Sequence, residues 1–315
     1  MAGTVTSALT AALRTTAAPM LSEALFRNNE LMPLFAPVGW EGGSTKNYKI
    51  HYGGNASVAT YAEGDALGTA GSQSYLTANF PEKHYRCLIQ VTGHVYDQLQ
   101  NGSPTAAFFN QVEKEFTYSI KDTVDLITTD MMGTGLTAPV GLQGIIDSAG
   151  TLAGIDPSTY TWWAAYEVAG AATTIAISDI DAALRNVRDP EYAADIDLIL
   201  TSHKQAQKLK GVFGNAGTSN NSVRSLISAG GYIVNTGDYT DIGVGGIPVI
   251  PLRDLTNSIF LGVHRECIEV ATQRPMRIEP LGKVDDSDKW LMTWAGGLTT
   301  TNRRHAFKIT GLTAA

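Results

Sequence analysis

Between residues 44 and 92, two segments in which apolar and polar residues alternate flank a glycine-rich gap. In the first, Tyr48, Ile50 and Tyr52 alternate with polar residues, and residues 84–92 repeat the pattern. A period of two is typical of half-buried strands. Glycines are spread through the gap, among many Ala, Ser and Thr residues, at Gly53, Gly54, Gly64, Gly68 and Gly71. The pattern predicts a long ribbon in which these two strands pair and carry a flexible tip.

A ribbon of this kind is not stable by itself. An isolated hairpin is marginal in water, and its edges present unpaired backbone donors and acceptors to any neighbour. Much of the chain is therefore committed to an element that needs a partner, which favours an assembling protein.

Residues 104–132 follow a helical pattern. Apolar side chains recur at steps of three and four, at Val112, Phe116, Ile120, Val124, Ile127 and Met131. Ser103 suits the N-cap, Pro104 suits the first turn, and Gly133 is expected to end the helix. With a rise of about 1.5 Å per residue, this helix is roughly 40 Å long, which is typical of a spine.

The rest of the chain mixes helices and strands. Helices are predicted at 178–190 and 202–211, and the glycine-rich stretch 211–246 is predicted to be mostly loop with brief strands. Strands are predicted at six short apolar runs, at 196–200, 247–251, 258–263, 276–280, 290–294 and 306–309. The order predicts an α+β protein in which an α/β domain is inserted between the helix and the closing strands.

The bulk composition limits the possible functions. The net charge is −7 and no basic cluster is present, whereas a protein that grips nucleic acid needs clustered Lys and Arg. The two cysteines, Cys87 and Cys267, have no disulfide or metal-ligand spacing. Neither a secretory signal nor a membrane-spanning segment is predicted.

No catalytic motif is found in the sequence. His264, Glu266 and Glu269 are the nearest approach to a metal cluster, and a surface ion pair is the favoured interpretation. The acidic run at 285–288 is better explained as a turn than as a calcium loop. We therefore expect no enzymatic activity, no cofactor and no metal.

The order of elements resembles that of the major capsid proteins of tailed bacteriophages, which have the Hong Kong 97 fold. The similarity is carried by residues 47–52 and 83–92, by the predicted helix at 104–132, by 195–202 and by 246–251. It implies an N-terminal arm (1–43), an extended β loop (44–100), a peripheral domain with a spine helix (101–139 and 276–315) and an axial α/β domain (140–275).

The resemblance also implies a function. The chain would assemble into pentamers and hexamers of an icosahedral shell that encloses double-stranded DNA without reading its sequence. It would be made in the host cytoplasm and kept in the virion, with a separate scaffolding protein, a portal and, as a further partner, a decoration protein. Residues 53–72 contain no lysine, so a covalent Lys–Asn link through the tip is not expected.

Several side chains are candidates for contacts between subunits. Apolar groups of the arm and the loop are expected to become buried against neighbours, and acidic groups near the tip are candidates to contact a neighbour's arginine. The candidates are Leu25, Phe26, Tyr48, Ile50, Tyr52, Glu63 and Asp65.

Two alternatives remain open from the sequence. An encapsulin, a bacterial compartment that encloses a cargo enzyme, has the same fold. An enzyme or a carbohydrate-binding module belongs to a different class, and a stable monomer with a small-molecule ligand would favour it.

Overall fold

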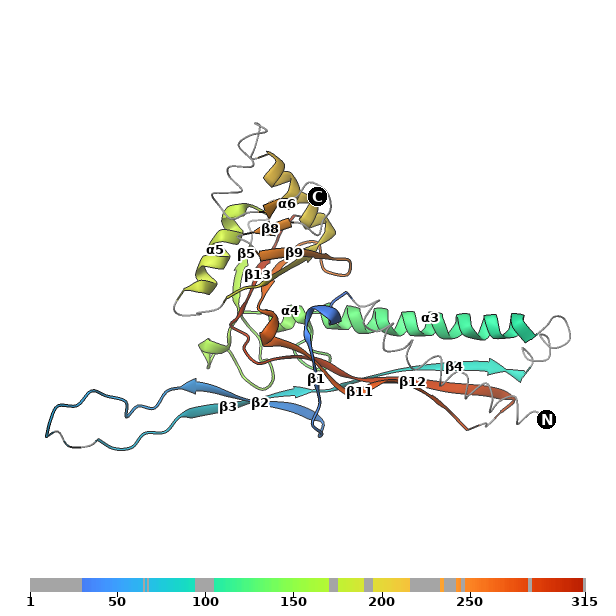
Figure 1. The fold of residues 1–315 in the computed structure, drawn as a ribbon, viewed down its shortest axis with the longest axis horizontal. Helices are drawn as coiled ribbons and strands as arrows, with labels where there is room; N and C mark the ends of the chain where they lie inside the picture. The colour runs from blue at the N-terminus through green and yellow to red at the C-terminus, as the bar shows by residue number, and fades with distance from the viewer. Residues whose placement is uncertain are drawn as a thin grey trace.

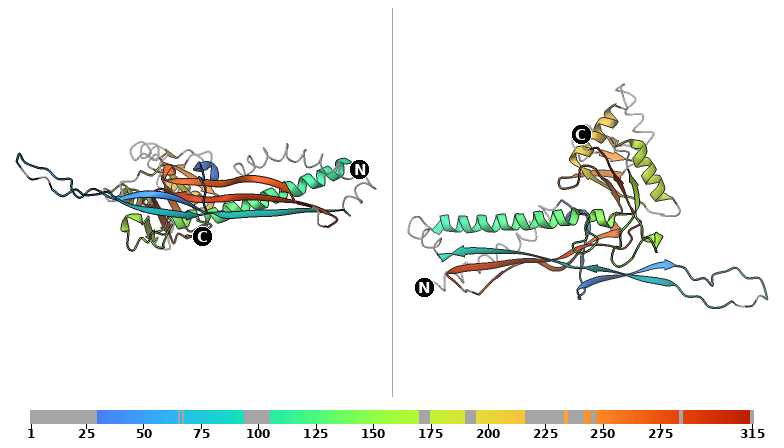
Figure 2. Two further views of the ribbon diagram at one scale, coloured as in Figure 1. Left: turned by 90° about the horizontal axis from the view of Figure 1, so that it is seen from below. Right: turned by 180° about the vertical axis from the view of Figure 1, so that it is seen from behind.

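The computed structural model describes residues 30–64, 66, 68–93, 105–169, 175–189, 195–215, 233–234, 242–244, 247–282 and 285–313. The chain is an α+β protein with two main sheets and a separate hairpin (Figure 1). The hairpin projects from one end of the molecule, and a long helix runs toward the other (Figure 2).

The first sheet, here called the long sheet, has the strand order β1-β11-β12-β4. These strands are β1 (Ala36–Gly39), β11 (Ile268–Pro280), β12 (Ser287–Thr300) and β4 (Lys83–Thr92). β12 pairs antiparallel with both β11 and β4, and β1 pairs parallel with β11.

The helix α3 (Thr105–Met132) lies along one face of the long sheet (Figures 1 and 2). The predicted apolar stripe forms the contact: the side chains of Phe116, Ile120, Val124, Ile127 and Met131 are buried. The ring of Phe116 meets Trp290 of β12 edge-on, with centroids 5.4 Å apart. The predicted spine helix is therefore confirmed, while Ser103 and Pro104 lie outside the described residues.

The second sheet, here called the upper sheet, has the order β5-β13-β10-β6-β9-β8-β7. Its strands are β5 (Tyr166–Ala169), β13 (Ala306–Thr310), β10 (Phe260–Val263), β6 (Leu198–Ser202), β9 (Ile247–Leu252), β8 (Ile242–Val244) and β7 (Ile233–Val234). Helices α5 (Ile177–Arg188) and α6 (His203–Asn215) pack on it. A core forms between them, from residues that include Ile180, Leu184, Leu209, Phe260 and Phe307.

The hairpin consists of β2 (Thr45–Gly53) and β3 (Ser74–Pro81), which pair antiparallel. The prediction that residues 47–52 pair with 84–92 was wrong, because β4 pairs with β12 instead. The segment 74–81 also alternates, with Leu76, Ala78 and Phe80 turned inward, and it returns directly from the tip. β4 can then form the edge strand of the long sheet beneath α3, where Tyr85 and Ile89 are buried.

Three further boundaries differ from the expected ones. α6 continues through Gly211 to Asn215, because an isolated glycine costs a helix only about 1 kcal/mol. β11 begins at Ile268, so residues 268–275 belong to the long sheet. β13 joins the upper sheet, although residues 276–315 had been expected to form one unit.

The connections between the two sheets are fixed by a buried arginine. Arg303, between β12 and β13, is fully buried and donates four hydrogen bonds to carbonyl groups at the end of the short helix α4 (Leu142–Ile145) and in the turn that follows it. The acceptors are the oxygens of Gly144, Ile145, Ala149 and Gly150, at 2.8 to 3.1 Å. The helical turn η2 (Thr161–Trp163) and the turns η1 (Met32–Leu34) and η4 (Arg265–Cys267) complete the described elements.

Across the part of the chain that is described, no helix combines the length and the apolar character needed to cross a membrane.

Candidate assembly surfaces

The end of the hairpin ladder next to the tip loop is held to the body by aromatic rings. The ring of Tyr52 stacks on Trp162, with centroids 5.3 Å apart and planes 6° apart. Tyr160 meets both rings edge-on at 5.9 Å, and Trp163 beside them is buried. Tyr52 still exposes 42% of its surface, so its outer side is open to a neighbour.

Tyr48 and Ile50 contact the body of their own subunit. The Tyr48 hydroxyl donates to Glu269 Oε2 at 2.5 Å and lies 3.0 Å from Thr299 Oγ1. Burial, reinforced by Glu269, raises the pKa of Tyr48 above its ordinary value. Ile50 packs partly buried against the main core. A role for these two residues between subunits stays a prediction.

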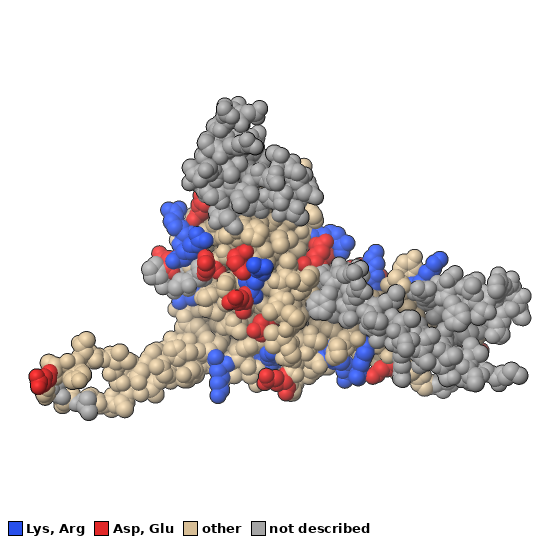
Figure 3. All heavy atoms as spheres, in the orientation of Figure 1, with Lys and Arg blue, Asp and Glu red and all other residues tan. Residues whose placement is uncertain are grey.

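The tip of the hairpin is exposed and acidic. Residues 54–73 contain no Lys or Arg, and Figure 3 shows acidic colour at the far end, where Glu63 is the described acidic residue. Glu63 is exposed, whereas Asp65, like Leu25 and Phe26, lies outside the described residues. Two large apolar side chains that the sequence analysis did not single out, Val58 and Tyr61, are 83% and 79% exposed. An exposed apolar and acidic tip is suited to contact another molecule.

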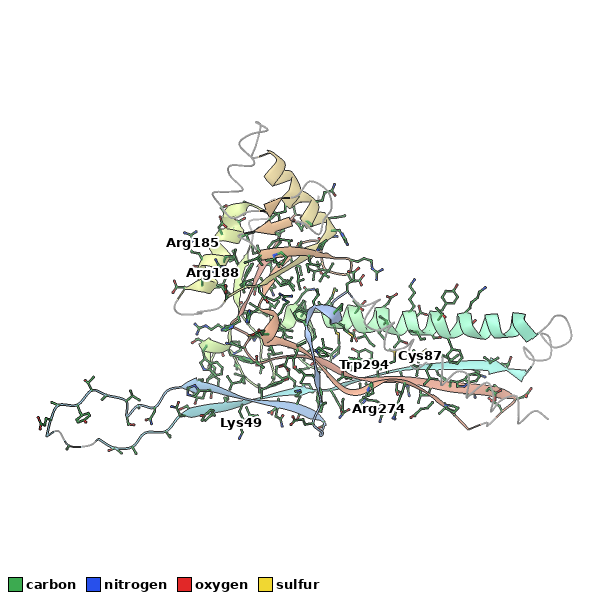
Figure 4. All side chains as sticks on the ribbon, in the orientation of Figure 1. Lys49, Cys87, Arg185, Arg188, Arg274 and Trp294 are labelled. Atoms are coloured by element: carbon green, nitrogen blue, oxygen red, sulfur yellow. The ribbon has the colours of Figure 1, made fainter. Side chains whose placement is uncertain are left out.

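The face of the long sheet opposite α3, here called the outer face, contains a cavity of about 440 Å³. It is lined by residues of three adjacent strands: His84, Tyr85 and Arg86 of β4, Leu291, Thr293 and Trp294 of β12, and Arg274 of β11. Figure 4 places Arg274 on the lower side of the sheet, the side that faces away from α3. Arg274 lies between two irregularities in the β11–β12 register, and such bulges redirect side chains.

The cavity is lined by two arginine side chains that have no partner among the described residues. Arg86 and Arg274 are exposed, and within the described part of the chain neither side chain forms an ion pair or a hydrogen bond. Of the nearby carboxylates, Glu279 lies 3.1 Å from Arg277 and Glu82 Oε1 lies 3.3 Å from His84, while Glu82 Oε2 is buried and has no hydrogen-bond partner among the described residues. The sequence analysis missed this site because β12 brings together two strands that are far apart in the chain.

The clusters considered for catalysis or metal binding are ordinary surface groups. His264 lies 3.9 Å from Asp197 and 3.8 Å from Glu266, while Glu269 is engaged by Tyr48. Asp285 accepts a hydrogen bond from Lys289 at 2.8 Å, in the turn before β12. Within the described residues, no group of three His, Cys, Asp or Glu side chains is arranged to hold a metal.

A match to a protein-family model identifies the class of protein that carries these surfaces. The model of the SU10 major capsid protein matches residues 53–313, which include the hairpin tip, α3 and both sheets. The chain belongs to the SU10 major capsid protein family. No curated protein sequence matches it.

Solved capsid structures have the same fold as this major capsid protein. The capsid of cyanophage A-1(L) is 16% identical, with a TM-score of 0.67 over 89% of this chain and 91% of that one. The capsid of the native GTA particle is 12% identical, with a TM-score of 0.59 over 90% of both chains. The encapsulin SrpI of Synechococcus elongatus is also 12% identical, with a TM-score of 0.59 over 90% of this chain and 87% of that one. The predicted Hong Kong 97-like architecture is confirmed.

Proposed function

We propose that this capsid protein assembles into pentamers and hexamers of a tailed-phage icosahedral shell that encloses double-stranded DNA. The observation that carries the proposal is the family match over residues 53–313. The shape of the subunit supports it, because the tip of the hairpin extends beyond the body (Figures 1 and 2). A projecting hairpin is stable only with partners, and a closed shell supplies them at every position.

The two sheets suggest different places in the shell. In this proposal the upper sheet belongs to an axial domain around the five-fold and six-fold axes, and the glycine-rich stretch 211–246 supplies the loops at the capsomer centre. The long sheet and α3 form the peripheral domain, while residues 1–43 clamp a neighbour. Because residues 268–275 belong to the long sheet and 306–310 to the upper sheet, the proposal assigns the first to the peripheral domain and the second to the axial domain.

The net charge of the chain suggests how the shell relates to the DNA inside it. A net charge of −7 repels packaged DNA instead of binding it, so the shell encloses DNA without recognising its sequence. The proposal includes a separate scaffolding protein and a portal, assembly in the host cytoplasm, and no enzymatic step by this chain. Without lysine at 53–72, the shell is held together by non-covalent contacts at the tip.

A cargo-enclosing encapsulin shell is the second candidate, because the SrpI encapsulin has this fold. The fold alone does not separate the two, and the family match favours the phage capsid.

Electron microscopy of the full chain, expressed alone and with the genes encoded beside it, tests the proposal. We expect closed particles, capsomer rings or tubes. Particles that protect double-stranded DNA from nuclease support the phage shell, and particles filled with one enzyme support the encapsulin. A uniform monomer under every condition would contradict both.

A further inference from the structure

Two short connections link the long sheet to the upper sheet, and they lie side by side. One runs from β10 through η4 to β11, and the other runs from β12 to β13 through residues 301–305. The backbone N–H of His264 in the first connection donates to the carbonyl oxygen of His305 in the second, at 3.1 Å. The N–H of Thr301 donates in the other direction, to the carbonyl oxygen of Cys267 at 3.0 Å. This contact between residues 264–267 and 301–305, here called the junction, therefore helps to hold the two sheets together.

Each connection contributes one histidine ring to the junction. The rings of His264 and His305 meet edge-on, with centroids 5.9 Å apart. Nδ1 of His264 is buried and has no hydrogen-bond partner among the described residues. Nδ1 of His305 lies 3.4 Å from Sγ of Cys267, whose side chain is buried. Because histidine is the side chain whose charge changes most readily around neutral pH, the junction brings two proton-accepting rings together.

The contact between Cys267 and His305 shows which of the two groups holds the proton. Burial raises the pKa of the Cys267 thiol, so the sulfur keeps its proton at neutral pH and is the donor. Nδ1 of His305 is then the acceptor, and its ring is neutral. Burial also lowers the pKa of His305, and the neighbouring His264 and Arg304 add to this effect. A proton on Nδ1 would place two donors face to face and remove the hydrogen bond.

The carboxylates around the junction do not offset a positive charge on its rings. Asp197 already accepts two hydrogen bonds from Arg265, from the backbone N–H at 2.9 Å and from Nε at 3.0 Å. Glu266 lies 3.8 Å from His264 but is 89% exposed, so that water screens its charge. Glu269 accepts a hydrogen bond from the hairpin. The described charged groups near the rings and the thiol are Asp197, Arg265, Glu266, Glu269 and Arg304.

We propose that the junction is sensitive to acid: protonation of His305 breaks its hydrogen bond with Cys267, repels His264 and loosens the contact between the two connections. The inference goes beyond the proposed shell function and does not depend on it, because it concerns the folded subunit.

The direction of the pH dependence follows from the lowered pKa of His305. In the unfolded chain, a histidine is protonated below about pH 6.5, whereas His305 in the folded subunit takes up its proton only at lower pH. The unfolded state therefore binds more protons between these two values. The stability that His305 contributes is fully present above about pH 6.5 and is lost as the pH falls through the lower value of the folded subunit.

Urea unfolding of the unassembled full chain at about pH 7.5 and about pH 5.5, on either side of the histidine value, measures this dependence. The equilibrium constant for unfolding should rise several-fold more in the wild type than in His305→Asn. The asparagine oxygen can accept the thiol of Cys267, but the amide is not protonated in this range. His51→Asn is the matched control, because that ring is exposed on the hairpin and contacts the neutral side chain of Gln73. It should keep the wild-type dependence on pH.

Amide hydrogen exchange supplies a local measurement. The amides of His264, Cys267 and Thr301 donate hydrogen bonds within the junction. Their protection, corrected for the intrinsic effect of pH on exchange, should fall several-fold in the wild type at the lower pH and stay constant in His305→Asn. The amides of β4 that pair with β12 lie outside the junction and should keep their protection in both proteins.

A second variant keeps the test decisive if His305→Asn does not fold. His264→Asn removes the ring that His305 would repel, so it should also weaken the dependence on pH. Equal pH dependence of the wild type and of every folded variant at these two positions would overturn the proposal. So would a wild-type subunit whose stability and junction protection are the same at both pH values. Either result would leave the shell function untouched, because that function is tested by the formation of particles.

Discussion

At the scale of single residues, Arg303 does more for the fold than any charged group predicted from the sequence. Its guanidinium donates to four carbonyl groups, two of which belong to the buried residues Gly144 and Ile145. Burial lowers the pKa of Arg303 to about 10, so the group remains charged at neutral pH. Beside it, Lys308 is held by Glu167 at 3.3 Å and Asp147 at 3.8 Å.

Arg303→Leu should lower the free energy of unfolding by about 3–5 kcal/mol, because the variant removes four hydrogen bonds and leaves the carbonyl groups of the buried residues Gly144 and Ile145 without this donor. Urea unfolding of the unassembled subunit measures the loss. Arg185→Leu, which removes an exposed arginine of α5, should change the same quantity by less than about 0.5 kcal/mol. Equal effects of the two substitutions would show that the guanidinium is not a structural clamp.

At the scale of elements, α3 and the hairpin differ in how they are stabilised. α3 is fixed along its length by one buried stripe, while the hairpin is attached along its inner face, through Tyr48, Ile50 and Tyr52. A helical stripe specifies its own buried face, so α3 could be predicted from the sequence. A period of two specifies the faces of a strand but not its partner. For this reason the strand at 74–81 was missed and β4 was assigned to the wrong neighbour.

The buried stripe of α3 predicts a contrast between two substitutions on one helix. Val124→Asp places a carboxylate at a fully buried position and should cost more than about 4 kcal/mol of stability. Leu126→Asp changes a side chain that is 53% exposed and should leave the melting temperature of the subunit nearly unchanged. A similar loss in both variants would mean that α3 does not pack on the long sheet through this stripe.

Trp162→Ala should loosen the hairpin without unfolding the body. The lost stacking on Tyr52 is worth about 0.5–1.5 kcal/mol, so amide hydrogen exchange in β2 and β3 should accelerate several-fold while β12 stays protected. Tyr118→Ala, at an exposed position on α3, is the control and should leave these rates unchanged. Unchanged amide exchange in β2 and β3 of the Trp162→Ala variant would show that the Trp162 ring does not hold the hairpin to the body.

At the scale of the whole molecule, the order of elements could be inferred from the sequence, but the cavity on the outer face could not. Glu63 and Asp65 were recognisable because they are the charged residues in a neutral, glycine-rich segment. Arg86 and Arg274 become neighbours only because β12 pairs with both β4 and β11, and no local pattern encodes that arrangement.

Removing residues 1–29 should abolish or misdirect assembly and leave the subunit folded, because the predicted clamp residues Leu25 and Phe26 are lost. Glu30 is kept, since its carboxylate accepts a hydrogen bond from the backbone of Arg253. Sedimentation measures assembly, and circular dichroism measures the fold. Normal shells from the truncated chain would rule out the clamp.

The direct continuation of β3 into β4 has a mechanical consequence. Only Glu82 separates the end of β3 at Pro81 from the start of β4 at Lys83, and β4 then pairs with β12 from Lys83 to Thr92. A pulling force on the tip is therefore transmitted along β4. The ladder of hydrogen bonds to β12 is then loaded in shear, so its bonds share the tension instead of breaking one after another. The pairing of β4 with β12 thus anchors the hairpin in the long sheet, beneath α3.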